Sequence, residues 1–219
     1  MLSELLEKVS LFRILHRIDT DLCKQLRQQG CPYCVGPLHQ SNYERKPRGG
    51  PDNIPDEYLI RQSLCCGRPE CRRRALPQSC LFMGRRVYWG CVILVVMTLK
   101  QNRADGPSAR KIKEMFGISR KTLKRWIDYF RDEFPASMQW QRLRGRLSST
   151  VSNNDLPAGV VHYFIENFPS PQQALIGCLQ FLASEPIGSH PSWCADCFTQ
   201  KTGVAFYRLK LIFSGSRIR

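Results

Sequence analysis

Apolar residues recur at steps of three and four through the first thirty positions, which is the spacing of one face of a helix. They are Leu2, Leu5, Leu6, Val9, Leu15 and Ile18. Gly30 follows the pattern, at a place where helices often end on a residue that tolerates positive φ. We therefore predict an N-terminal helix over 2–29, within a segment 1–30, that packs against the rest of the chain or against a partner.

The most apolar run, Val87 to Leu99, is bounded by Arg86 and Lys100. A membrane span needs about 20 apolar residues, so this run is too short for one and no membrane partner is expected. A uniformly apolar stretch of this length is typical of a helix buried in a protein core. We predict the first of three helices in a domain over 81–134, with Cys91 as a small core side chain.

Between Pro107 and Phe134 the periodicity predicts two short helices joined by a tight turn at Gly117. Ser108 and Ser119 precede them, and each hydroxyl can accept a backbone N–H at a helix start. The apolar face of the first helix holds Ile112, Met115 and Phe116. That of the second helix holds Leu123, Trp126, Ile127 and Phe130. Both helices are therefore expected to bury one side.

The opposite side of the second helix is basic. The order of apolar residues around Gly117 resembles the helix-turn-helix family, in which the second helix enters the major groove of DNA. The matching residues are Ile112, Phe116, Ile118, Leu123 and Trp126. Lys113 departs from the family pattern, which has a small residue there. An ordinary helical hairpin with a solvated basic face is the alternative. The DNA contacts that the resemblance predicts on this helix are Ser119, Arg120, Lys121, Lys124 and Arg125.

Cysteine spacing adds a candidate metal site to this picture. Cys31 and Cys34, followed by Gly36, are typical of a zinc knuckle, a tight turn whose thiolates converge on one ion. The chain then offers a strand over 38–48, a Pro- and Gly-rich loop, and a returning strand over 58–64. The sequence therefore predicts a β-hairpin that brings two cysteine pairs together.

We take Cys66 and Cys71 as the second ligand pair. Cys65 is the alternative, but adjacent strand residues point to opposite faces, and the shorter loop from Cys66 to Cys71 makes the tighter knuckle. His39 is a further candidate, although a surface histidine on the first strand is the simpler interpretation. Four thiolates make a closed, structural site, so we predict one Zn²⁺ per chain in a zinc ribbon over 31–80. Buried thiols without metal are the alternative.

Charge narrows the choice of partner. The chain has 219 residues, with 33 Lys+Arg against 18 Asp+Glu, a net charge of +15 and a pI of about 9.6. Such an excess favours a polyanion, most commonly double-stranded DNA, with an anionic membrane surface as the alternative. Arg72, Arg73 and Arg74 directly follow the last predicted ligand and suit phosphate contacts. The N-terminus lacks the apolar core of a signal peptide, so a cytoplasmic, nucleoid-associated protein without a disulfide framework is expected.

Beyond Pro135 the sequence is less informative. Two amphipathic or buried helices are expected within 135–186, where they complete the core or form a homodimer contact. Cys194 and Cys197 form another Cys-x-x-Cys pair in the tail 187–219, but no second pair follows, so we interpret it as incidental. The fold class predicted for the chain is mainly α, with a small zinc-bound β-hairpin and a three-helix helix-turn-helix domain.

The order of these motifs resembles the zinc-ribbon plus helix-turn-helix N-terminal part of bacterial insertion-element transposases, and accessory proteins encoded beside an integrase in mobile elements. The resemblance rests on CPYCVG, CCGRPECRRR, GRRVYWG and FGISRKTLKRW, roughly half of the chain. It implies target-DNA binding and delivery of a separate recombinase or integrase. Catalysis is not carried over, since cutting DNA needs about three clustered carboxylates, and few acids follow Phe134. A transcriptional regulator, a transposase or nuclease fragment, and a protein–protein adaptor are the alternatives.

Overall fold

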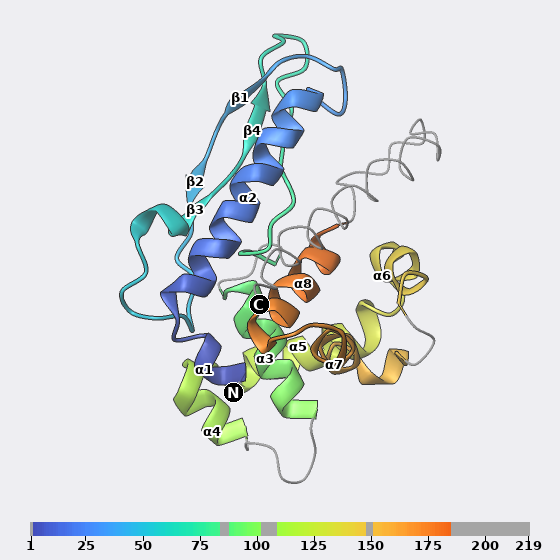
Figure 1. Ribbon diagram of the computed structural model, residues 1–219. Helices are drawn as coiled ribbons and strands as arrows, with labels where there is room; N and C mark the ends of the chain where they lie inside the picture. Colours follow the sequence, from blue (N-terminus) through green and yellow to red (C-terminus); the bar gives the residue numbers. More distant parts are fainter. Residues whose placement is uncertain (1, 84–87, 102–108, 148–150, 185–219) are drawn as a thin grey trace, which may run out of the picture. The chain divides into compact units, whose positions relative to one another are not determined.

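The computed structural model describes residues 2–83, 88–101, 109–147 and 151–184. They form a mainly helical fold with a small sheet, as predicted, and belong to one compact unit over 1–185 (Figure 1). The predicted boundaries inside this range fall between elements of that unit. The predicted cap Ser108 and the tail 187–219, with Cys194 and Cys197, lie outside the described residues.

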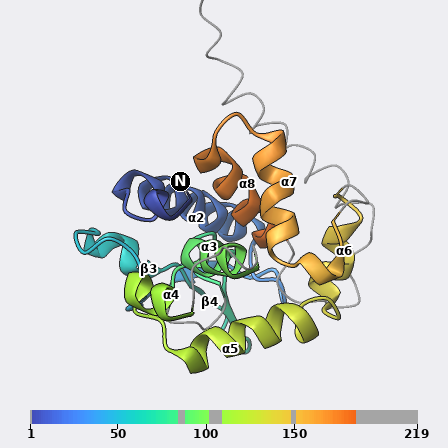
Figure 2. The same ribbon diagram turned by 90° about the horizontal axis from the view of Figure 1, so that it is seen from below.

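Helix α3 (Gly90–Gln101) is the centre of the core. No residue from 91 to 97 is more than 1% exposed, so the predicted buried helix is confirmed. Figure 2 shows α3 between one pair of helices, α4 and α5, and another, α7 and α8, and it contacts all four. Their bounds are Ala109–Phe116, Arg120–Asp128, Ala158–Asn167 and Pro171–Ala183. Within the described ranges, no helix combines the length and the apolar character needed to span a lipid bilayer.

The N-terminal region forms two helices, α1 (Leu2–Leu5) and α2 (Val9–Gln29), so the predicted single helix over 2–29 is wrong. Between them the N–H groups of Leu6, Glu7 and Lys8 bond to carbonyls three residues back, and Lys8 is extended. The break lets α1 pack against α8 while α2 packs against a 3₁₀ helix, η1 (Asp56–Leu59). Helix α2 ends at Gly30, as predicted.

The predicted hairpin is present, but its strands are short and broken. Strand β1 (Leu38–Gln40) pairs antiparallel with β4 (Leu64–Cys66), and β2 (Tyr43–Glu44) pairs antiparallel with β3 (Ile60–Arg61). The continuous strands predicted over 38–48 and 58–64 are wrong, because at the break the Asn42 side chain accepts the Ser63 N–H (3.0 Å). A third strand that no pattern predicted, β5 (Arg74–Ala75), pairs with β4.

The described part of 135–184 contains α6 (Met138–Arg144) in addition to the two predicted helices, α7 and α8. Ser137 caps α6, because its hydroxyl accepts the Trp140 N–H (3.1 Å). Trp140 is fully buried and its ring packs against Phe134. Phe134 follows a π-helical turn, η2 (Tyr129–Glu133), that extends α5. A serine cap and a buried tryptophan therefore mark a helix that the sequence pattern did not predict.

A buried carboxylate ties α2 to the segment that follows β5. Asp19 is 1% exposed, and it accepts hydrogen bonds from the Cys80 N–H (2.6 Å) and the Ser79 hydroxyl. Burial raises the pKa of Asp19 to about 6, although these donors and the nearby charge of Arg61 favour the ionised form. Because this pKa lies above the ordinary value of 3.8, the native state binds the proton more tightly than the unfolded chain does.

Replacing Asp19 by Asn should change how stability depends on pH. Between about pH 4 and 6 native wild type holds a proton that the unfolded chain has lost, so its unfolding free energy falls as pH rises through this window. The unfolding free energy of Asp19→Asn should not fall in this window, because the amide does not titrate. Relative to wild type it should therefore rise by up to about 3 kcal/mol between about pH 4 and 7. Denaturant unfolding at several pH values measures the difference. Asp21→Asn, at an exposed position of α2, is the matched control, and a pH-independent difference for Asp19→Asn would contradict the expectation.

Candidate metal centre and basic helix

Four cysteines converge just beyond the C-terminal end of α2. The Sγ atoms of this tetrad all lie within 4.8 Å of one another. Two of the separations are 3.8 Å, from Cys31 to Cys71, and 3.5 Å, from Cys34 to Cys66. The four cysteines predicted as ligands do lie together, and the tetrad could hold a metal ion.

Both cysteine pairs close the same kind of turn. Val35 and Arg72 directly follow the second cysteine of each pair, and both have positive φ, 58° and 46°. That conformation is unusual for any side chain and rare for a β-branched one. It turns the next backbone N–H, of Gly36 or Arg73, toward the sulfur before it. The two turns therefore share a geometry although their cysteines are spaced differently.

Backbone donors also serve the first cysteine of each pair. Burial opposes ionisation of Cys31, but the N–H groups of Tyr33 and Cys34, with the neighbouring thiols, outweigh it and lower the pKa of Cys31 to about 7. Cys66 also accepts the N–H of Arg68, but burial and neighbouring thiols raise the pKa of Cys66, and the pKa values of Cys34 and Cys71 are raised as well. The N–H donors therefore point toward the sulfurs of the tetrad, and Cys31 is the thiol that they make easiest to ionise.

Cys65 points away from the tetrad, as the alternation of a strand requires. Its Sγ donates to the Arg72 carbonyl (3.4 Å), and in the β1–β4 pairing it lies opposite His39. His39 is exposed and is not one of the converging residues. Cys66, the preferred candidate, is therefore the one that joins the tetrad, and Cys65 does not.

The tetrad lies in a small apolar cluster that is separate from the main core. Its buried members are Cys23, Cys31, Leu38, Leu64, Cys66 and Ala75. Helix α2 contributes Cys23 and the adjacent Leu26, so it covers one side of the strands. Strands of two or three residues are not stable on so few contacts, which leaves the tetrad as the main available support.

The three arginines predicted to contact phosphates, at 72–74, follow the tetrad and are all exposed. Two of them lie over aromatic rings: the guanidinium of Arg73 is 4.7 Å from the ring centre of Tyr33, and that of Arg74 is 5.6 Å from that of Tyr43. Arginine keeps its charge and most of its donors in such a contact. The rings therefore position cationic groups around the tetrad.

Helices α4 and α5 meet at a short turn. Gly117 has φ of 61°, a conformation that L side chains rarely adopt. Ser119 caps α5, as predicted, because its hydroxyl accepts the Thr122 N–H (3.1 Å). Met115 is 47% exposed, so its predicted place on the buried face is wrong; an eight-residue helix meets its neighbours along a narrow stripe, which Met115 only borders. The buried residues are Ile112, Phe116, Ile118, Leu123 and Trp126.

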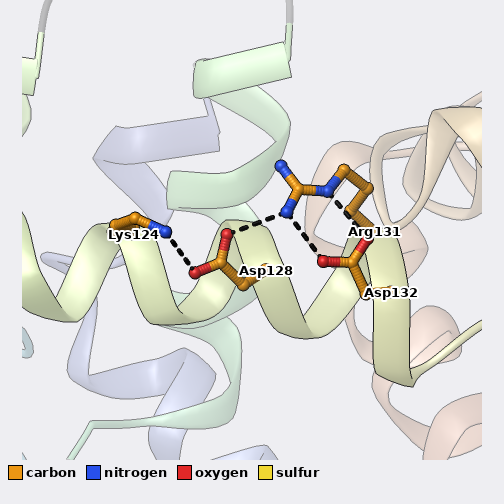
Figure 3. A network of polar contacts seen from close by, with 4 residues as sticks. All are labelled: Lys124, Asp128, Arg131 and Asp132. Atoms are coloured by element: carbon orange, nitrogen blue, oxygen red, sulfur yellow. Dashed lines mark hydrogen bonds and ion pairs between the residues drawn. The ribbon is translucent and has the colours of Figure 1, made fainter.

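The basic residues predicted on α5 are all exposed, but they are not equally available. Lys124 pairs with Asp128 (2.7 Å), while Arg131 pairs with Asp128 (3.1 Å) and with Asp132 (2.7 Å) (Figure 3). The hydrogen bond and charge of Asp132 raise the pKa of Arg131. Our sequence reasoning missed these acids, although the i,i+4 spacing of Lys124 and Asp128 is a recognised signal of such a pair. Ion pairs therefore occupy the C-terminal end of α5.

The N-terminal turn of α5 has a different character. Arg120 and Lys121 are exposed there. Arg125, in the last turn of α5, is exposed as well, and its described contact is a hydrogen bond to the Thr122 hydroxyl (3.3 Å). A neutral hydroxyl leaves the charge of Arg125 uncompensated. These three side chains can therefore offer positive charge and several N–H donors to an anionic partner.

Two adjacent cysteine variants should separate the metal ligands from their neighbours. Cys66→Ser should lose the bound metal and lower the melting temperature, because the tetrad then lacks one thiolate and the strands lose their main support. Cys65→Ser should keep the metal content of wild type, since Cys65 Sγ points away from the tetrad. Elemental analysis of the three purified proteins measures this, with one metal ion per chain expected for wild type. Equal metal in Cys66→Ser and wild type would contradict the site.

Comparison with family models, with curated proteins and with solved structures finds no match to this chain. The residues and their geometry are therefore the basis for any functional conclusion. They comprise a cysteine tetrad that can hold a metal ion, and a pair of helices that bury one side and present basic side chains on the other.

Proposed function

We propose that this protein is a non-catalytic DNA-binding protein in which α4 and α5 act as a helix-turn-helix unit. The observation that supports it best is that apolar and basic side chains lie on different sides of this helix pair. Its apolar side chains are buried against α3, and the basic ones at the start of α5 are exposed. A rigid helix that displays arginine and lysine at its N-terminal turn matches the way recognition helices enter the major groove. The net charge of +15 favours the same class of partner.

The ion proposed for the tetrad is zinc, in a structural role. Zn–S bonds of about 2.3 Å in a tetrahedron place the sulfurs about 3.8 Å apart. The Sγ–Sγ separations across the two pairs, 3.8 Å from Cys31 to Cys71 and 3.5 Å from Cys34 to Cys66, fit that geometry. Four thiolates leave no open position for water, so the ion would hold the short strands together. The strands with their bound ion would then form a zinc ribbon.

The predicted DNA contacts on α5 would have different roles, because their side chains have different partners in the structure. Arg120, Lys121 and Arg125 are the proposed contacts to base edges and nearby phosphates. The hydroxyl of Ser119 is engaged by Thr122, so Ser119 acts mainly as the helix cap. Lys124 has to leave Asp128 before it can bind a phosphate, and an exposed pair of this kind is worth about 1 kcal/mol at most.

A place in a mobile genetic element is the biological role we propose for this binding. It rests on the resemblance of the motif order to insertion-element transposases and to integrase-associated proteins. In that role the protein would mark a DNA target for a separate recombinase. The arginines at 72–74 would add phosphate contacts beside the zinc ribbon, since guanidinium groups bind phosphate as a fork.

Truncating one arginine of α5 tests base reading. Arg125→Ala should weaken binding to a duplex selected from a random library by about 1–3 kcal/mol, because a guanidinium fork on guanine is worth that much discrimination. Binding to unselected duplex should change far less. Arg131→Ala on the same helix is the matched control, since ion pairs with Asp128 and Asp132 hold Arg131. Fluorescence anisotropy measures the affinities of wild type and both variants for each duplex, and an equal loss of affinity by Arg125→Ala on both duplexes would exclude a base-reading role.

Salt dependence tests the phosphate contacts as a group. If about six phosphates are neutralised, the logarithm of the binding constant should fall against the logarithm of salt concentration with a slope near −5. The same anisotropy titration at several potassium chloride concentrations measures the slope. An affinity that barely depends on salt would show that the basic surface does not bind the DNA backbone.

A further inference from the structure

The loop between β2 and η1 brings two exposed basic side chains into the fold, and neither has been given a role so far. Its sequence is Lys46-Pro47-Arg48-Gly49-Gly50, and Lys46 and Arg48 are both exposed. Pro47 inside this Lys46–Gly50 loop restricts its backbone, so holding it in one conformation costs less entropy. The sequence suggested only a Pro- and Gly-rich connection here, because nothing local says where such a loop lies.

Close backbone contacts hold the Lys46–Gly50 loop against the core. Arg48 forms an isolated parallel bridge with Tyr88. A Cβ at Gly49 would lie 2.9 Å from the Val92 side chain, and one at Gly50 would lie 2.6 Å from the Trp89 ring nitrogen. Both separations are too short for a side chain, so only glycine allows the loop to approach α3 this closely. The loop is therefore seated in a defined place.

That place is beside the turn between α4 and α5. The same Cβ position at Gly49 is 3.6 Å from the carbonyl oxygen of Phe116, the last residue of α4. Tyr88 continues the contact, because its hydroxyl donates to the Gly117 carbonyl (3.4 Å) and its ring meets the edge of Trp126. Figure 2 shows the chain between β2 and β3 next to α4. The loop, Tyr88 and the α4–α5 turn thus form one continuous contact.

The distance from the loop to the proposed DNA contacts is short. Ser119 follows Phe116 by three residues, which at full extension span about 11 Å at most. Backbone phosphates border the major groove, which is about 12 Å wide, so a duplex held by α5 has phosphates at a similar distance from the start of that helix. The long side chains of Lys46 and Arg48 can therefore reach a strand beside that groove.

We propose that the Lys46–Gly50 loop is a second DNA-contacting element, in which Lys46 and Arg48 bind backbone phosphates next to the groove that α5 enters. This inference rests on the proposed function, since it places the loop relative to DNA held by α5. The loop itself has two basic residues and no acid, and the nearest acids along the sequence are Glu44 and Asp52. Phosphate contacts of this kind fix the register of a recognition helix without reading bases.

Charge-neutralising variants of the full-length, metal-loaded protein test the loop. The double variant Lys46→Gln/Arg48→Gln should bind a mixed-sequence DNA duplex at least about tenfold more weakly at about 100 mM salt, and its salt slope should be smaller by about 1.8, or 0.9 for each lost phosphate contact. Arg13→Gln/Arg17→Gln removes the same charge from exposed positions of α2 and is the matched control. It should weaken binding by less than about threefold. Glutamine is tolerated at exposed positions, and circular dichroism checks that both variants fold.

The outcomes distinguish this inference from the proposed function. If both double variants lose affinity equally, only overall charge matters, and the result contradicts a direct contact between the loop and DNA. If Arg125→Ala weakens binding while Lys46→Gln/Arg48→Gln binds as wild type does, the loop inference fails and the role of α5 stands. If wild type does not bind duplex even at about 50 mM salt, the proposed function fails and the loop inference fails with it. The loop inference is supported if Lys46→Gln/Arg48→Gln alone loses affinity and its salt slope is smaller than that of wild type.

Discussion

A helix that is apolar on every side has to be covered on every side, and α3 imposes this constraint on the protein. Seven consecutive residues, 91–97, are almost completely buried, so α3 has no side that can face water. The α4–α5 pair covers part of it, α7 and α8 cover another part, and the Lys46–Gly50 loop closes on its first turn. Because α4 and α5 pack their apolar residues against α3, their polar and basic residues face outward. The surface that we propose to bind DNA is a consequence of how α3 is buried.

The tetrad lies beyond the C-terminal end of α2, where the short strands need a stabilising element. The strands there are too short, and their apolar cluster too small, to be stable as a separate core. A bound ion would replace the missing hydrophobic contacts, since structural zinc contributes on the order of 10 kcal/mol to the folding of small modules. The buried Asp19 links the two regions, because it joins α2 to the segment that runs from β5 toward α3. Loss of the metal would then also destabilise the region around α3, in addition to the strands.

Charge is distributed unevenly over the proposed binding surface. The N-terminal turn of α5 carries Arg120 and Lys121, while Asp128 and Asp132 neutralise Lys124 and Arg131 toward the other end, where Arg125 also lies. The Lys46–Gly50 loop adds positive charge near the first of these regions. An electrostatic field with this asymmetry would orient α5, so that its N-terminal turn meets the DNA first.

Local chemistry made several features of this protein predictable from its sequence. Cysteine spacing identified the tetrad, uniform apolarity identified α3, and Gly117 with Ser119 marked the turn before α5, because each signal depends on neighbours within one or two turns of chain. Other features depend on residues far apart in the sequence. The break before α2, the third strand β5, the hydrogen bonds of Asp19 with the segment after β5 and the seat of the Lys46–Gly50 loop on α3 and α4 were decided only by tertiary packing. The physical reason is that burial and hydrogen bonding are settled by which elements meet, and a periodic pattern does not contain that information.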